Sequence, residues 1–147
     1  MPSHTSNTRL ATTPQDAYDY LTIPACWHEW HPASLGTVPN ERLSQPAGAT
    51  FEERIHTAGF RRRLRWRVVA AQRPDFWEGT ATMDDGSTVR LRYDFAADGD
   101  CTIFTRRLDY TIAPRWLRIV DALVGRFRIR RESAAALRRL QQRFVPK

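Results

Sequence analysis

Long apolar runs are absent from this chain. No stretch of about 18 consecutive apolar residues occurs, so the sequence offers no membrane-spanning helix. The first ten residues, MPSHTSNTRL, lack the basic head and apolar stretch of a secretory signal, and a cytoplasmic location is therefore expected. Cysteine is scarce, with only Cys26 and Cys101. Without a secretion signal we expect two reduced thiols, with a disulfide as the alternative.

Lysine is almost missing, because the basic side chains are 22 arginines and the single Lys147, for a net charge of +7. Arginine suits forked contacts with carboxylate or phosphate. The arginines alternate along predicted strands, so we interpret most of them as solvated strand faces. The segment RFRIRR, Arg126 to Arg131, has an alternative interpretation as a site for an anionic membrane or nucleic acid. Phe127 and Ile129 interrupt it, and we expect no nucleic-acid partner and no integral membrane contact.

Signatures of catalysis and metal binding are also missing. The chain has no GxSxG nucleophile motif, no phosphate-binding P-loop and no HExxH zinc motif. His28 and His31 lie three residues apart beside Glu29, but a zinc site needs a third protein ligand at suitable spacing. The sequence therefore predicts no metal and no cofactor.

What the chain does contain is enough apolar material for one domain over residues 1–147, since 41% of its residues are hydrophobic. A weak edge strand is expected over residues 4–12. Thr13 and Pro14 suit the cap and first turn of a short helix. A second short helix is expected from Pro24 to Trp30. The N-terminal part therefore predicts one strand followed by two helical pieces.

From Phe51 to Ile112 apolar residues alternate with polar ones, which is typical of antiparallel strands with one buried face. A further short strand is expected near Leu35 to Val38. Four turns predict the pairing of these strands. The turn at 58–59 places Thr57 opposite Phe60 and Ile55 opposite Arg62, and the turn at 72–75 places Ala71 opposite Phe76 and Val68 opposite Gly79. The turn at 84–86 places Met83 opposite Ser87 and Ala81 opposite Val89. The turn at 98–99 places Ala97 opposite Asp100 and Tyr93 opposite Phe104.

Residues that face one another across strands share one side of a sheet, so the turns predict a common inner face. Nearly all of its members are apolar. The predicted set is Phe51, Glu53, Ile55, Arg62, Leu64, Trp66, Val68, Trp77, Gly79, Ala81, Met83, Val89, Leu91, Tyr93, Phe95, Phe104, Arg106, Leu108 and Tyr110.

The last predicted element is a long helix from Pro114 to Phe144. At 1.5 Å per residue it spans roughly 45 Å, so it must lie across the sheet to bury its apolar side. The predicted apolar stripe repeats at three- and four-residue steps. It consists of Trp116, Val120, Leu123, Phe127, Ala134, Leu137 and Phe144.

A resemblance to a known family rests on the order of these elements and on four segments, LATTPQDAYDYLTIPACWHEWHP, GATFEERI, WRVVAAQRP and SAAALRRLQQRF. With these features the chain resembles the START-like (SRPBCC) superfamily, in its polyketide cyclase/dehydrase and lipid-transport group. The resemblance covers nearly the whole chain. It implies an α+β helix-grip fold, in which a curved antiparallel sheet of about seven strands wraps a long C-terminal helix beside two short N-terminal helices. It also implies a cavity for lipids, quinones or polyketide-like molecules.

The inner face then predicts a ligand site. The predicted ligand-binding residues are Trp30, Leu64, Trp66, Trp77, Leu91, Tyr93, Phe104, Arg106, Trp116 and Val120, with Trp27, His28 and Tyr110 at the cavity rim. Such aromatic walls suit a flat apolar ligand, and the alternative is that they fill a closed core.

Three charged residues fall on this inner face. Glu53 lies diagonal to Arg62 and is expected to pair with it. Arg106 is expected opposite Leu91, either meeting an acidic or carbonyl group of a ligand or reaching the rim or Glu53. Tyr93 and Tyr110 offer hydroxyl groups for the same purpose.

Three functions are compatible with these residues. The leading one is a binding protein for a hydrophobic small molecule, acting as a monomer or homodimer. The second is an enzyme of the polyketide cyclase/dehydrase kind, with Arg106 and a tyrosine polarising a carbonyl group. The third is an arginine-rich surface module for anionic partners.

Overall fold

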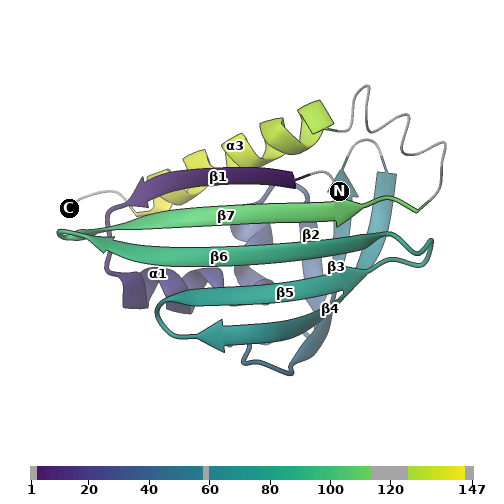
Figure 1. Cartoon of the computed structure of the whole chain (residues 1–147), viewed down its shortest axis with the longest axis horizontal. Coiled ribbons are helices and arrows are strands. Elements are labelled where there is room, and N and C mark those ends of the chain that lie inside the picture. The colour runs from purple at the N-terminus through teal and green to yellow at the C-terminus, as the bar shows by residue number, and fades with distance from the viewer. Residues whose placement is uncertain (1–2, 58–59, 114–125, 145–147) are drawn as a thin grey trace.

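Seven antiparallel strands form one strongly curved sheet in the computed structural model, which describes residues 3–57, 60–113 and 126–144 (Figure 1). The order across the sheet is β1-β7-β6-β5-β4-β3-β2, so only β1 and β2 are edges. The strands are β1 (Ser3–Leu10), β2 (Ser34–Val38), β3 (Thr50–Thr57), β4 (Phe60–Gln72), β5 (Phe76–Thr82), β6 (Thr88–Asp98) and β7 (Cys101–Thr111).

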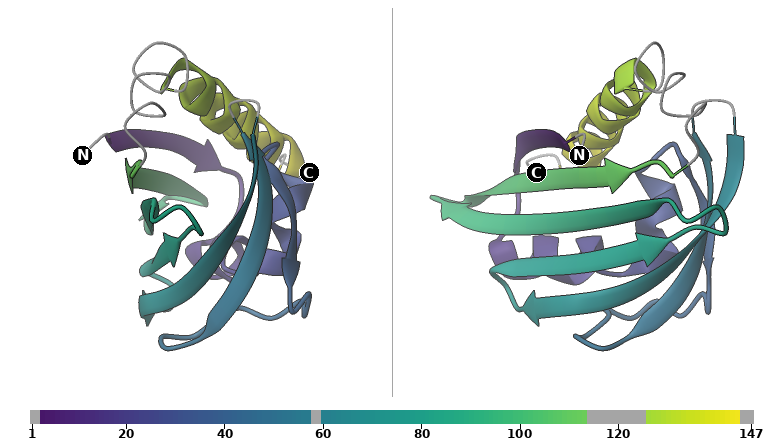
Figure 2. Two further views of the ribbon diagram at one scale, coloured as in Figure 1. Left: turned by 90° about the vertical axis from the view of Figure 1, so that its right-hand side faces the viewer. Right: turned by 45° about the vertical axis from the view of Figure 1, so that its right-hand side comes forward.

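Two short helices connect the edge strands, as the sequence predicts. The first, α1 (Pro14–Leu21), begins where the Thr13 hydroxyl accepts a hydrogen bond from the Asp16 backbone N–H at 3.2 Å. The second is a 3₁₀ helix, η1 (Pro24–Glu29). Both lie within the curve of the sheet (Figure 2).

The terminal helix, α3 (Arg126–Arg143), runs beside edge strand β1 (Figures 1 and 2), and its predicted start at Pro114 lies outside the described residues. Its buried residues are Ser133, Ala136 and Leu140. The predicted stripe is wrong at Phe127, which is 67% exposed, and at Ala134, which is also exposed. Leu137 and Phe144 pack partly buried against the core, and Trp116, Val120 and Leu123 lie outside the described residues.

Two of the predicted hairpin registers are confirmed in full. Ile55 faces Arg62 across the first hairpin, with Thr57 opposite Phe60. Ala81 faces Val89 across the third, where Gly86 adopts the predicted left-handed conformation with φ +86°.

The second hairpin differs from the prediction near its turn. Val68 faces Gly79 as predicted, but Ala71 faces Trp77, whereas the four-residue turn predicts Phe76. The actual turn is one residue shorter, and a bulge between Val68 and Ala70 absorbs the difference. The bulge restores the predicted face alternation along the rest of the strand.

The fourth hairpin slips by two residues. Its turn is Gly99-Asp100, with Asp98 opposite Cys101, so Tyr93 faces Arg106 and Phe104 faces Phe95. The predicted pairs of Tyr93 with Phe104 and of Arg106 with Leu91 are therefore wrong. Because strand side chains alternate with a period of two, this slip leaves every residue on its predicted face.

The core lies on the inner face of the sheet. Every member of the predicted inner set is buried or partly buried. His56, which lies between inner-face positions of β3, is exposed. Cys26 and Cys101 are free thiols.

Candidate functional site

A cavity of about 180 Å³ lies between the inner face of the sheet, the η1 segment and the start of α3. Most of its surface is apolar, and the sheet contributes to it mainly from strands β3, β4, β6 and β7. The apolar and aromatic lining residues include Trp27, Trp30, Ile55, Leu64, Trp66, Val89, Leu91, Tyr93, Leu108 and Tyr110.

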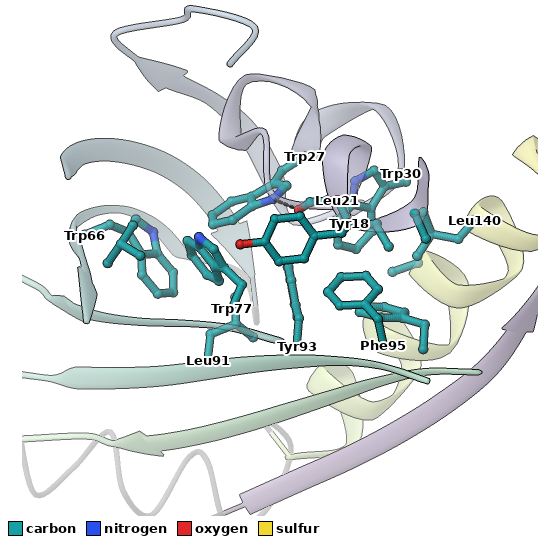
Figure 3. Close-up of a cluster of buried hydrophobic side chains, with 14 of the residues drawn as sticks. Tyr18, Leu21, Trp27, Trp30, Trp66, Trp77, Leu91, Tyr93, Phe95 and Leu140 are labelled. Carbon is teal, nitrogen blue, oxygen red and sulfur yellow. Dashed lines mark hydrogen bonds between the residues drawn. The ribbon is translucent and has the colours of Figure 1, made fainter. Parts of the chain in front are cut away.

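Aromatic rings from η1 pack on aromatic rings from the sheet (Figure 3). The Trp27 ring centroid lies 5.6 Å from that of Trp66 and 5.7 Å from that of Trp77, in edge-to-face geometry. The Trp27 indole N–H donates to the Leu21 carbonyl at 2.8 Å, which fixes the ring. Trp27 is 3% exposed and Trp30 is 1% exposed. Both tryptophans are therefore core residues that also form a cavity wall, and the predicted rim position of Trp27 is wrong.

Arg106 forms the polar end of this cavity. Its side chain comes from the centre of β7 and is only 6% exposed. The guanidinium Nη1 donates to the Ser133 hydroxyl of α3 at 3.0 Å, and Nη2 lies 3.2 Å from Nε2 of His31. Within the described ranges, no carboxylate forms an ion pair with Arg106, and its buried Nε has no hydrogen-bond partner. Arg106 therefore does not reach the rim and does not pair with Glu53.

His31 follows η1 and presents its ring to Arg106. Its Nδ1 accepts a hydrogen bond from the Ala33 backbone N–H at 3.1 Å. Burial, and then the positive charges of Arg106 and Arg139, hold the pKa of His31 well below its usual value. The ring is therefore neutral at physiological pH.

Glu53 is the carboxyl group of β3 that points into the cavity, and it is 6% exposed. The Trp66 indole N–H donates to its Oε1 at 3.1 Å. Burial raises the pKa of Glu53 to about 7, although Ser34, Trp66 and the Arg106 charge act in the opposite direction. The predicted pair with Arg62 is wrong, because Arg62 pairs with Asp85 in the turn after β5.

Tyr93 stands on β6 directly across from Arg106. Its ring packs on Phe104 with a centroid separation of 5.1 Å, and burial raises the pKa of its hydroxyl above the usual value while the Arg106 charge lowers it. The phenol is therefore a neutral hydrogen-bonding group at the polar end of the cavity.

The structure brings most of the predicted site residues together, because Trp27, Trp30, Leu64, Trp66, Leu91, Tyr93, Arg106 and Tyr110 all line the cavity. Trp77 and Phe104 do not, since both are fully buried in the closed core. His28 is exposed and does not line the cavity. Trp116 and Val120 lie outside the described residues.

The sequence did not predict the two side chains that contact the Arg106 guanidinium from outside the sheet, His31 and Ser133. Ser133, Ala136 and Leu140 share one helical face at steps of three and four, and this spacing was the available signal for Ser133. His31 carried no comparable signal, because its contact with Arg106 depends on how η1 is placed over the sheet.

No group of three or more potential metal ligands gathers anywhere in the described ranges. The same ranges contain no helix long and apolar enough to cross a membrane.

The comparisons with known proteins agree with this architecture. A protein from Rhodobacter sphaeroides has 20% sequence identity and a TM-score of 0.72, covering 96% of this chain and 90% of its own. A START superfamily protein from Mycobacterium smegmatis has 13% identity and a TM-score of 0.70, with 97% and 96% covered. Major latex-like protein 151 from Panax ginseng has 13% identity and a TM-score of 0.68, with 99% and 98% covered.

No curated protein matches the chain. The structural similarities establish the helix-grip fold predicted from the sequence. The model of one family, "Polyketide cyclase / dehydrase and lipid transport", matches residues 1–145, and the chain belongs to that family.

Proposed function

We propose that the protein binds a hydrophobic small molecule, such as a lipid, quinone or polyketide-like compound, in the cavity beneath η1. The observation that carries the proposal is the division of the cavity into an aromatic wall and one polar end at Arg106. Ligand pockets commonly combine an apolar lining with a few polar groups that orient the ligand. The family's association with lipid transport supports the same function.

Native mass spectrometry of freshly purified protein tests this function first. We expect a copurifying small molecule or, failing that, stoichiometric binding from a panel of lipids, quinones and polyphenols. A Leu64→Arg variant, which places a charge on the apolar wall, should lose that binding. Failure of the natural protein to bind any member of the panel would contradict the proposal.

A second candidate function is catalysis on a carbonyl compound, and the observation that favours it is Glu53. Its pKa of about 7 suits a general acid or base, and it shares the cavity with Arg106 and Tyr93. In such a reaction Glu53 removes a proton beside the carbonyl group, and Arg106 stabilises the resulting enolate.

Glu53→Gln separates the two functions. For a binding protein, the variant keeps the affinity for its ligand to within a few-fold. For an enzyme, turnover of an enolisable polyketide-like substrate falls by about 10²–10⁴-fold with binding retained. Turnover that is unchanged in the variant removes Glu53 from the mechanism.

A further inference from the structure

We propose that the ligand carries an anionic oxygen group, such as a carboxylate, that binds between Arg106 and His31. This inference rests on the proposed binding function, because it names the chemistry of the ligand's polar end. It follows from three observations at that end of the cavity: a surplus of hydrogen-bond donors, a buried cation without a counterion, and an excess of positive charge nearby.

The donor surplus is centred on His31. Its Nδ1 faces the Ala33 backbone N–H at 3.1 Å, and its Nε2 faces Nη2 of Arg106 at 3.2 Å. A backbone N–H and a guanidinium can only donate, whereas a neutral imidazole has one acceptor nitrogen and one N–H. When Nδ1 accepts from Ala33, the Nε2–H of His31 points at a donor. An acceptor atom placed between His31 and Arg106 satisfies both groups.

Arg106 itself lacks a negative partner. Burying an unpaired charge is costly, so buried cations are normally matched by a carboxylate or another anion. The groups that the described residues place against the Arg106 guanidinium are all neutral, namely Ser133, His31 and Tyr93, and its Nε has no hydrogen-bond partner. Trp30 contributes another buried N–H without a partner to the same cavity wall. The lining thus contains two buried donor groups, on Arg106 and Trp30, that have no acceptor in the described residues.

The surrounding charges favour an anion further. The positive charges of Arg106 and Arg139 help to lower the pKa of His31, and those of Arg106 and Arg130 help to lower the pKa of His4 in β1. Two carboxyl groups line the cavity, Glu53 and Glu132. Glu53 accepts a hydrogen bond from Trp66, and no ion pair of the described residues joins either carboxyl group to Arg106.

A carboxylate completes this arrangement without a change of fold. One oxygen accepts from Nε2–H of His31, and the guanidinium donates to the other, which is the geometry that arginine favours with carboxylates. The hydrophobic body of the ligand then lies along Trp66 and Leu91.

Matched probes test the inference. Isothermal titration calorimetry or competitive fluorescence compares 2-naphthoate with 2-naphthamide and naphthalene, and decanoate with decanamide. A charged hydrogen bond contributes about 1.5–3 kcal/mol, so each acid should bind about 10- to 100-fold more tightly than its amide. In Arg106→Gln this preference, the ratio of the amide's dissociation constant to that of the acid, should fall below about threefold.

Arg107→Gln is the matched control, because Arg107 neighbours Arg106 but is exposed on the outer face and pairs with Asp109. It should keep the full preference for the acids. Ser133→Ala gives a second variant with a smaller change at the same end of the cavity, and it should weaken the acids more than the amides.

The outcomes separate this inference from the proposed function. If naphthalene and the amides bind as tightly as the acids, the anion site is wrong and the hydrophobic site stands. If no member of either series binds, both proposals fail. A preference for the acids that Arg106→Gln retains while circular dichroism shows a native fold also contradicts the anion site.

Discussion

At the residue scale, two buried titratable groups act on stability in opposite directions. Glu53 has a pKa of about 7 in the folded protein and 4.5 as an unperturbed group, so the folded state retains a proton that the unfolded state releases. Its effect makes the free energy of unfolding fall as pH rises from about 4.5 to about 7. His31 has a lowered pKa in the folded protein, so below pH 6.5 the unfolded state binds a proton at His31 and the folded state does not. Its effect is a loss of stability on acidification below 6.5.

Glu53→Gln should therefore remove the fall in stability that Glu53 causes as pH rises, and leave the rise in stability that His31 causes. Relative to the natural protein, we expect the variant to gain on the order of 2–3 kcal/mol of unfolding free energy between pH 5 and pH 8. Urea denaturation at several pH values measures the difference. Glu52→Gln, on the outer face of the same strand, is the matched control for loss of a carboxyl group. A pH-independent difference between Glu53→Gln and the natural protein would contradict the assigned role of Glu53.

Arg106 gives the second prediction at this scale. Replacing buried ionic groups by packed apolar ones is often stabilising by about 1–4 kcal/mol. Because Arg106 has no counterion in the described residues, Arg106→Met should raise the free energy of unfolding of the ligand-free protein by an amount in that range. Arg107→Met should change it by less than about 0.5 kcal/mol. Destabilisation of Arg106→Met by denaturant titration would mean that its contacts with Ser133 and His31 outweigh the cost of burial.

At the scale of single elements, Gly79 of β5 permits two tryptophans to close over the strand. A Cβ atom built at Gly79 lies 2.9 Å from the Trp77 ring and 3.3 Å from the Trp66 ring. Gly79→Ala should therefore force the aromatic wall apart and destabilise the protein by about 1–3 kcal/mol. Tryptophan fluorescence during urea unfolding reports both the loss of stability and the altered ring packing. An unchanged midpoint would show that the rings move aside at little cost.

The sheet could be predicted from sequence because its signal is local. Alternation places Leu64, Trp66 and Val68 on one face whatever the neighbouring strand does. Register depends on turn geometry, and there the prediction fails in detail, as the Gly99-Asp100 turn and the bulge at Val69 show. The stripe of α3 was misplaced because Phe127 and Ala134 are apolar yet exposed, and helix periodicity alone does not distinguish them from Ser133.

The site was only partly predictable for the same reason. Arg106 was identified because its face follows from alternation alone. Its contacts with His31 and Ser133 join positions 75 and 27 residues away in the chain, and no local pattern encodes them.

At the scale of the whole molecule, ligand binding should stabilise the fold as a unit. The cavity is lined by strands β3, β4, β6 and β7, the η1 segment and α3, so a bound ligand can contact all of these elements at once. A ligand that binds only the folded state adds about 2.7 kcal/mol at 100 times its dissociation constant. We expect 2-naphthoate to raise the midpoint of thermal unfolding in a concentration-dependent manner, and Arg106→Gln to reduce that shift. A midpoint independent of 2-naphthoate concentration would exclude binding of this probe to the folded state.

The alternation of side chains in this sheet has a consequence for how such chains can diverge. An insertion or deletion that shifts the pairing of a hairpin such as β6–β7 by two residues would keep every side chain on its side of the sheet. A change by one residue is tolerated only when a bulge such as that at Val69 cancels it. We therefore expect hairpins of this fold to tolerate pairing shifts of two residues, because the same side chains still face the cavity.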